Sequence, residues 1–513
     1  MANLPDQNNQ AASPAPLPKA PALSKAPGLP KSPGFFSVFP SIMLPMFLAV
    51  VDQTIVATAL PAIVATMGGV ERVSWIVVSY LIAATISAPI YGRLGDSFGR
   101  RNMMFVALAI AIVASILCAM ATSIEMLSLA RLLQGFGGGG LMTLSQALVG
   151  ETIPPRERAR YQGYLAGIAV CANSFGPVAG GYLTQHFGWQ SIFLVNVPVA
   201  IGAAVLALRL PKPPAERLPW STDPGGIILF SILVFTTLFS LEQFQRVRVS
   251  DLPLGAALLA AAIVALVLLI RHENRQASPL IPLSLLRQPA IWHSDALAAC
   301  HGAALVSLIV FVPVYLQVVR GASPSETGLV LVPLTIGIGI GSLVTGRLVS
   351  RTGRTTIFPI VGLTATTICF GVLAIWASQL GTNGLAVMML LIGTFMGTVM
   401  GVVQVSVQSA AGQLRLGEGA ASVQFSRSIG AAFGTALVAM VLFAYLAVRN
   451  PSAAQVFAAM VEHRAHTGPV LSVAERLVIQ ADIDGAFRAG FMMMAAFCLT
   501  GLVLALTNPQ RRI

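Results

Sequence analysis

The stretch Gly92-Arg-Leu-Gly-Asp96-Ser-Phe-Gly99-Arg100-Arg101 recurs as Gly346-Arg-Leu-Val-Ser350-Arg-Thr-Gly353-Arg354. Two glycines and two arginines return at the same spacing, 254 residues later. Internal repeats of this kind are typical of secondary transporters built from two similar halves. In the second copy Ser350 replaces the acid, so only Asp96 can make the charge contacts of this loop. The repeat therefore predicts a two-half helical architecture.

Composition places this two-half chain in a membrane. Of its 513 residues 56% are hydrophobic and 10% are charged, and the mean hydropathy is +0.80. A soluble domain carries about 25% charged residues, so the chain is predicted to be a polytopic membrane protein in contact with lipid. The net charge of +12 lies in short clusters between apolar runs, which argues against a nucleic-acid partner.

Apolar runs of about 20 residues, each long enough to cross the hydrocarbon, recur along the chain. The predicted spans are 36–58, 74–93, 102–122, 124–147, 160–184, 189–209, 224–243, 252–271, 291–319, 325–348, 356–377, 383–409, 420–447 and 486–508. Fourteen spans put both termini on one side. The arginine clusters at 100–101, 156–160 and 351–354 mark that side as cytoplasmic, in a multi-pass protein of the cytoplasmic (inner) membrane.

The repeat also divides the chain into parts. Residues 1–34, rich in Pro, Ala and Ser, are predicted to be a disordered cytoplasmic tail. An N-terminal six-helix bundle is expected at 35–210, an inserted helix pair with its loop at 211–289, and a C-terminal six-helix bundle at 290–513. Within the last part, the polar segment 448–485 is interpreted as an external loop, and less readily as a cap over an exit.

Asp52 lies inside the first predicted span and Arg131 inside the fourth. A charge at the bilayer centre costs roughly 2.5–3.5 kcal/mol on insertion scales, so such residues usually face a partner or a cavity. Counting from the outer surface at 1.5 Å per residue, both lie roughly 10 Å deep. An acid and a base at one depth indicate a proton-handling site. The alternatives are a hydrogen-bonded Asp52 with no transport role, and an Arg131 that only braces Gln134.

Several motifs carry a family resemblance. The glycine-arginine loop resembles the signature of the major facilitator superfamily. The stretch from Val51 to Pro61 resembles the first-helix motif of the fourteen-span drug:proton antiporters of the EmrB/QacA type, and Arg131-Leu-Leu-Gln134-Gly135-Phe-Gly137-Gly138 resembles their fourth-helix motif. The glycines and proline of 167–181 resemble the fifth-helix antiporter motif; they are Gly167, Gly176, Pro177, Gly180 and Gly181.

The resemblance implies roles for these residues. It implies proton coupling by Asp52 and Arg131, and a conformational latch between the halves in the loop of Gly92, Asp96, Gly99, Arg100 and Arg101. An acid such as Asp96 gains from the dipole at the start of another helix. In the fifth helix, the glycines are expected to allow close helix approach and Pro177 to bend the helix at the interface between the halves.

Polar groups in other spans are candidates for a substrate cavity, or for hydrogen bonds between helices. They are Gln134, Gln317, Gln404, Gln408 and Arg427. Asp295 and His301 share the ninth span, where a lone histidine is more often a satisfied core residue than a proton relay. The sequence has no catalytic constellation, no metal-ligand spacing and no GxxxxGK[ST] loop, so we expect neither an enzyme nor a cofactor, and an ion gradient as the energy source.

The expected function is proton-coupled export of amphipathic, often cationic drugs. Export of a metabolite, siderophore or lipid by the same fold is the alternative, and a receptor or scaffold that moves nothing is a third hypothesis. The expected partners are a small drug-like molecule, protons and membrane lipid. In a two-membraned bacterium the resemblance also implies a periplasmic adaptor and an outer-membrane channel.

Overall fold

The computed structural model describes residues 35–68, 72–210, 223–246, 252–276, 279–280, 283–461 and 473–512. The N-terminal bundle contains α1 (Phe35–Met67), α2 (Ser74–Phe98), α3 (Arg100–Ala119), α4 (Ile124–Thr152), α5 (Pro155–Phe187), α6 (Ser191–Leu194) and α7 (Asn196–Ala207). The pair α8 (Pro224–Arg246) and α9 (Leu252–Glu273) follows. The rest comprises α10 (Leu283–Leu286), α11 (Pro289–Val318), α12 (Pro324–Thr352), α13 (Ile357–Trp376), α14 (Thr382–Ala411), η3 (Gln413–Arg415), α15 (Leu416–Arg449), α16 (Pro451–Val461) and α17 (Val473–Thr507). The predicted tail at 1–34 lies outside the described residues.

The described residues are all-helical apart from one isolated bridge between Arg354 and Arg512. Eleven of their helices are long and apolar enough to cross a membrane. Three of the fourteen predicted spans correspond instead to α4, α5 and the consecutive α6 and α7. The helix α4 contains three charged residues, Glu125, Arg131 and Glu151. The run from Ser191 to Ala207, which holds α6 and α7, is only 17 residues long.

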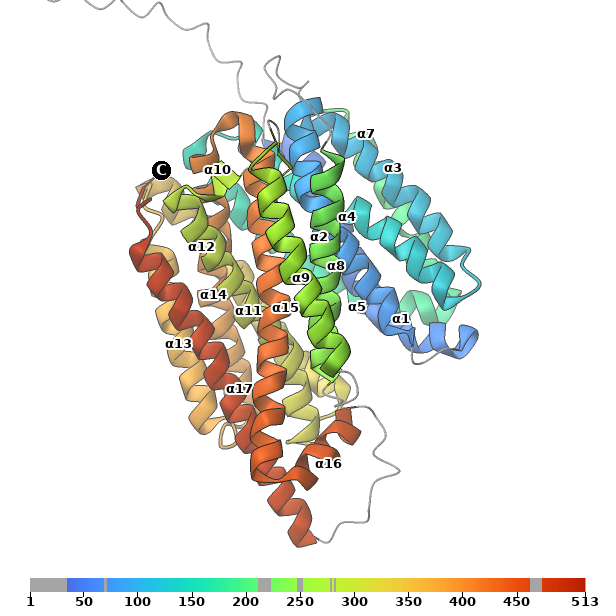
Figure 1. Cartoon of the computed structure of the whole chain (residues 1–513), viewed down its shortest axis with the longest axis vertical. Helices are drawn as coiled ribbons and strands as arrows, with labels where there is room; N and C mark the ends of the chain where they lie inside the picture. Colours follow the sequence, from blue (N-terminus) through green and yellow to red (C-terminus); the bar gives the residue numbers. More distant parts are fainter. Residues whose placement is uncertain are drawn as a thin grey trace, which may run out of the picture.

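The two bundles meet at one end and diverge toward the other, as Figure 1 shows. At this closed end α5 packs against α12, and α2 and α4 pack against α15. The start of α1 lies at the same end, where Ser41 Oγ donates to the carbonyl of Leu206. The end of the chain lies there too, since the amide of Thr355 donates to the carbonyl of Arg511. Both ends of the described chain therefore lie at the closed end.

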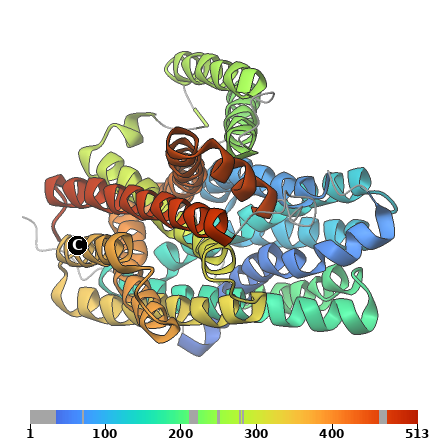
Figure 2. The same ribbon diagram turned by 90° about the horizontal axis from the view of Figure 1, so that it is seen from below.

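The helices α8 and α9 stand outside the two bundles (Figure 2), and α8 packs against α2 of one bundle and α15 of the other. Toward the N-terminal bundle, the rings of Trp75 and Phe239 lie 5.2 Å apart. Toward the C-terminal bundle, the rings of Phe230 and Phe425 lie 5.1 Å apart. Because aromatic pairs at these distances attract one another, α8 is fixed to α2 near one of its ends and to α15 near the other.

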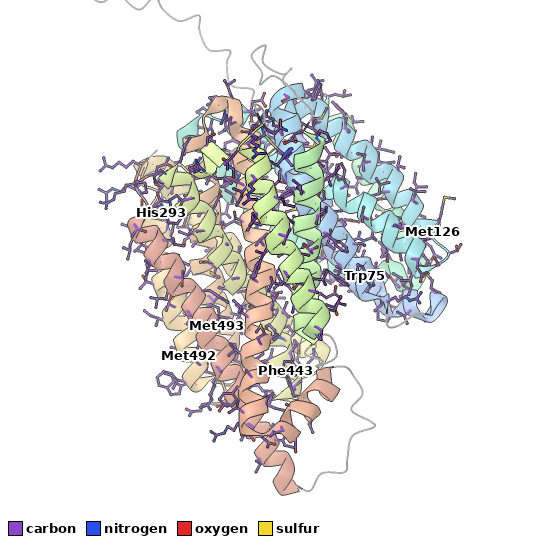
Figure 3. All side chains as sticks on the ribbon, in the orientation of Figure 1. Trp75, Met126, His293, Phe443, Met492 and Met493 are labelled. Atoms are coloured by element: carbon purple, nitrogen blue, oxygen red, sulfur yellow. The ribbon has the colours of Figure 1, made fainter. Side chains whose placement is uncertain are left out.

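Apolar side chains cover much of the outer surface, as expected of helices that face lipid. Figure 3 labels Met492 on α17, and its side chain is 58% exposed. The core of the C-terminal part is made by buried aliphatic and aromatic side chains, among them Phe370, Phe487 and Phe491.

The interpretation of 448–485 as a loop is wrong for much of the segment. The helix α15 continues to Arg449, α16 occupies Pro451–Val461, and α17 begins at Val473, before its predicted start at 486. The start of α16 has a local cause, since Asn450 Oδ1 accepts from the amide of Ala453 as an N-cap and proline suits the first helical position. Residues 462–472 lie outside the described part.

Candidate functional site

The two charges singled out by the sequence form an ion pair inside the N-terminal bundle. Arg131 Nη1 on α4 donates to Asp52 Oδ2 on α1 at 2.8 Å. The other carboxylate oxygen of Asp52 accepts from Gln134 Nε2 at 2.8 Å and from Asn196 Nδ2, at the start of α7, at 2.6 Å. Asp52 is 4% exposed and Arg131 1%. Side chains from α4 and α7 thus donate three hydrogen bonds to one carboxylate on α1.

Arg131 is held by further groups besides Asp52. Its Nη1 also donates to Gln134 Oε1 at 2.8 Å, and its Nε donates to the carbonyl of Ile76 on α2 at 3.3 Å. The guanidinium lies 4.2 Å from the centre of the Tyr80 ring, a favourable cation–π distance. The Tyr80 hydroxyl in turn donates to the carbonyl of Ala49 on α1. The base therefore contacts α1, α2 and α4 together.

Glycines on α4 let it approach α2 closely enough to build this site. A Cβ atom added at Gly135 would lie 2.8 Å from the Cα of Tyr80, and one at Gly139 would lie 2.7 Å from the Cα of Ala84. Real side chains do not fit at such separations from backbone, so both positions require glycine. The run of glycines after Arg131 is a packing surface.

The site has little free space. A cavity of ≈10 Å³ lies beside Asp52, Tyr80, Ser115, Gln134 and Asn196. That volume approximates the minimum for one water molecule. Removing the charge of Asp52 here would leave Arg131 buried without its partner, which costs about 3–5 kcal/mol. Loss of the Asp52 charge therefore favours a rearrangement of the base.

The predicted latch residues lie at the closed end, between the bundles. Asp96 Oδ1 and Oδ2 accept from the amides of Gly417 and Glu418 at 3.0 Å each. These amides belong to the first turn of α15, where the helix dipole favours an anion. Arg93 Nη1 donates to Glu418 Oε1 at 2.5 Å, also across the interface.

The arginines that follow this loop act within one bundle. Arg100 pairs with Asp96 and with Glu151, the latter at 2.7 Å. Arg101 Nη2 donates to the carbonyl of Leu208 at 3.0 Å. The chain turns between α2 and α3 at Gly99, whose φ of +93° favours glycine.

The two copies of the repeat occupy corresponding places. Gly353 has a φ of +67° at the end of α12, as Gly99 has after α2. A Cβ at Gly92 would lie 2.6 Å from the carbonyl oxygen of Gly417, and one at Gly346 would collide with the carbonyl of Ala159 on α5. Each first glycine of the repeat therefore allows a helix of the opposite bundle to approach, once on each side of the interface.

The fifth-helix glycines differ from the expectation in what they contact. A Cβ at Gly176 would lie 3.1 Å from the Cβ of Thr54, and one at Gly180 would lie 2.6 Å from the carbonyl oxygen of Ile55. Both neighbours are on α1, in the same bundle. At Gly167 and Gly181 a Cβ would meet nothing within 4 Å. The motif, with Pro177 inside α5, serves packing within the bundle; the approach to the other bundle is made by Gly163, against the carbonyl of Ser342.

The five cavity candidates do not converge on one place. Gln134 belongs to the Asp52 site, and Gln317 is exposed at the end of α11. Gln408 Nε2 donates across the interface to the carbonyl of Gln146 at 2.9 Å, whereas the Nε2 of buried Gln404 has no hydrogen-bond partner within the described structure. Arg427 bonds Gln424 on its own helix.

Two polar residues beside Asp52 were missed by reasoning from the sequence. Neither Asn196, which donates to Asp52 Oδ1, nor Ser115, which accepts from Gln134 Nε2 at 3.0 Å, was predicted as a site residue. The signal for Asn196 was a lone amide inside an apolar run, the same signal that singled out Asp52. His301 is a satisfied core residue, with Nε2 3.1 Å from the carbonyl of Met396.

Comparisons with known proteins agree with this architecture. The family model described as Major Facilitator Superfamily matches residues 42–435. An uncharacterized MFS-type transporter of Mycobacterium tuberculosis is 32% identical over 81% of this chain, and the match spans 61% of that protein's length. The multidrug transporter protein MdtP of Bacillus subtilis is 30% identical over 78% of this chain and 74% of its own.

The fold itself is found among solved structures. The human organic anion transporter MFSD10 superposes with a TM-score of 0.63, covering 92% of this chain and 100% of its own, at 15% identity. At that identity the likeness concerns the fold alone.

Proposed function

This chain belongs to the major facilitator superfamily, a family of transporters and not of enzymes, and from that premise we propose that it is a proton-coupled multidrug efflux antiporter of the fourteen-span EmrB/QacA type. In this proposal α4, α5 and the consecutive α6 and α7 complete the fourteen spans. Asp52 carries the proton, and an amphipathic, often cationic drug moves outward as the proton moves in.

The observation that carries the proposal is the buried carboxylate with three donors. Arg131, Gln134 and Asn196 fill both oxygens of Asp52 in a site closed to bulk water. A proton on Asp52 removes the charge that offsets Arg131, and the cost of a buried unpaired cation drives the base toward another arrangement. Proton binding and conformation are coupled by that free energy.

The helix α2 supplies a physical connection from this site to the latch. Near its first turn Ile76 and Tyr80 contact Arg131, and near its last turn Arg93 and Asp96 hold α15. Twenty residues separate Ile76 from Asp96, about 30 Å along a helix. A movement of Arg131 therefore acts on the same rigid element that closes the interface between the bundles.

The orientation follows from charge. The closed end holds Arg100, Arg101 and Arg158 together with both ends of the described chain, so we assign it to the cytoplasm. The protein then lies in the cytoplasmic (inner) membrane, open toward the outside in this conformation. A periplasmic adaptor and an outer-membrane channel remain proposed partners, on the resemblance alone.

Transport in proteoliposomes tests the proposal. An imposed pH gradient should drive a cationic dye against its concentration gradient, and Asp52→Asn should abolish that movement. The matched control is Asp482→Asn, the same change at an acid that bonds Arg449 and Asn450, which should transport normally. A wild-type protein that ignores the gradient, or an Asp52→Asn protein that transports as well as the control, would refute proton coupling through Asp52. Gradient-driven movement of a metabolite, siderophore or lipid but of no drug would reassign the cargo and keep the mechanism.

A further inference from the structure

A cavity of ≈330 Å³ lies where α8 and α9 pack beside α2, α11 and α15, away from the Asp52 site. This volume is in the range of sites for small organic ligands. Its walls are mainly leucine, isoleucine and aromatic side chains from α8, α9, α10, α11 and α15. The cavity is therefore suited to an apolar body of drug size.

One wall of the cavity carries an acid with an unused oxygen. Asp295 on α11 is 6% exposed, and its Oδ1 accepts from Ser422 Oγ at 3.3 Å. Its Oδ2 has no hydrogen-bond partner among the residues that the structure describes. Glu273 and Glu418 line the same cavity, and none of the described residues that line it is Lys or Arg. A buried carboxylate oxygen without a partner is costly, and a cation in the cavity would offset that cost.

The rim of the cavity is apolar and exposed. Leu266 and Ile270 on α9 are 43% and 40% exposed, and Trp292 on α11 is 45% exposed. All three line the cavity and also belong to the outer surface of helices long enough to span a membrane. A ligand dissolved in lipid could thus reach the acid without first entering water.

The cavity also borders the interface between the bundles. Glu418 lines it and accepts from Arg93 at 2.5 Å. Ala421 lines it too, and a Cβ at Gly92 would lie 2.9 Å from the Cβ of Ala421. An occupant of the cavity therefore contacts the helix α15 at the place where α2 closes on it.

We propose that this cavity binds a lipophilic organic cation arriving from the membrane, with Asp295 as its counter-charge. The inference rests on the proposed function and deepens it, because it gives the exported class of compound a binding site beside the inserted helix pair. A bound cation would lie beside Glu418, which pairs with Arg93 across the interface. Cargo binding and opening of the closed end would therefore involve the same side chain.

Equilibrium binding of tritiated tetraphenylphosphonium to the purified protein tests this site. Asp295→Asn should weaken binding about tenfold or more, as expected when one partner of a buried charge pair is removed. Leu266→Trp fills the rim at a partly exposed position, where folding is little affected, and should weaken binding similarly. Asp482→Asn is the matched control and should bind as the wild type does.

The outcomes separate this inference from the proposed function. A wild-type protein that binds no tetraphenylphosphonium, or Asp295→Asn and Leu266→Trp proteins that both bind within about twofold of it, would overturn the inference. Should Asp295→Asn fail to fold, Leu266→Trp decides alone. Failure of the proposed function shows differently, as wild-type protein that transports nothing on a pH gradient while its binding still depends on Asp295.

Discussion

Removing the charge of Asp96 should open the closed end. In the structure its two oxygens accept from two amides of α15 at 3.0 Å each, and it pairs with Arg100. Asp96→Asn keeps one acceptor oxygen and loses a charge-assisted bond, worth about 1.5–3 kcal/mol. Arg100 retains Glu151 as its partner, so little offsetting loss arises within the N-terminal bundle. The ratio of closed to open molecules should fall about 10- to 100-fold.

Distances between spin labels measure this shift. Labels at Phe98, the last residue of α2, and Leu414, in η3, are both on exposed side chains, 39% and 48%, and on opposite bundles. The distance distribution should gain a longer component in Asp96→Asn. The control is Ser350→Ala, the corresponding position of the second repeat copy. Within the described part of the chain, Ser350 Oγ donates only to the carbonyl of Arg347 on its own helix. An unchanged distribution in Asp96→Asn, or an equal shift in Ser350→Ala, would refute the latch.

Three further outcomes are expected. Asp52→Asn should lower the free energy of unfolding by about 3–5 kcal/mol, because Arg131 is left buried without its counter-charge. Adding Arg131→Met should recover most of that loss in a double-mutant cycle, since no buried charge then remains. Additive losses would contradict a direct ion pair. Gly180→Ala should destabilise the protein in denaturant titration by about 1–3 kcal/mol because its Cβ meets the backbone of α1, whereas Gly181→Ala, with open space around it, should unfold as the wild type does. Gly163→Leu should lengthen the same spin-label distance, since a side chain there meets the carbonyl of Ser342 at the interface; a distance that stays short would show that α5 and α12 do not control closure.

The charged residues were the most predictable part of this protein. A carboxylate and a guanidinium inside apolar runs are so costly that depth along the two helices sufficed to pair Asp52 with Arg131, now seen at 2.8 Å. The recurrence of Gly92 and Gly346 likewise indicated two related halves, and both glycines lie at the interface between the bundles. Their proposed roles in transport stay predictions.

Packing partners could not be read from the sequence in the same way. The glycines at 176 and 180 indicate that another helix approaches α5 closely. Which helix approaches is decided by the tertiary structure, and that helix is α1. The cavity around Asp295 is assembled from six helices distant in sequence, so no local pattern announces it. The start of α16 was readable from Asn450 and Pro451, but the helix is short and charged residues follow it in the sequence after Val461, so the whole segment was interpreted as a loop.

The inserted helix α8 has a mechanical consequence. Its Phe239 ring contacts Trp75 of one bundle, and its Phe230 ring contacts Phe425 of the other. One rigid helix that packs against both bundles cannot keep both contacts when the bundles move relative to each other. Any rocking of the bundles would therefore separate one of the two ring pairs, so α8 should slow the transport cycle. Replacing Phe239 or Phe230 by a smaller side chain should change the turnover rate without altering any charge.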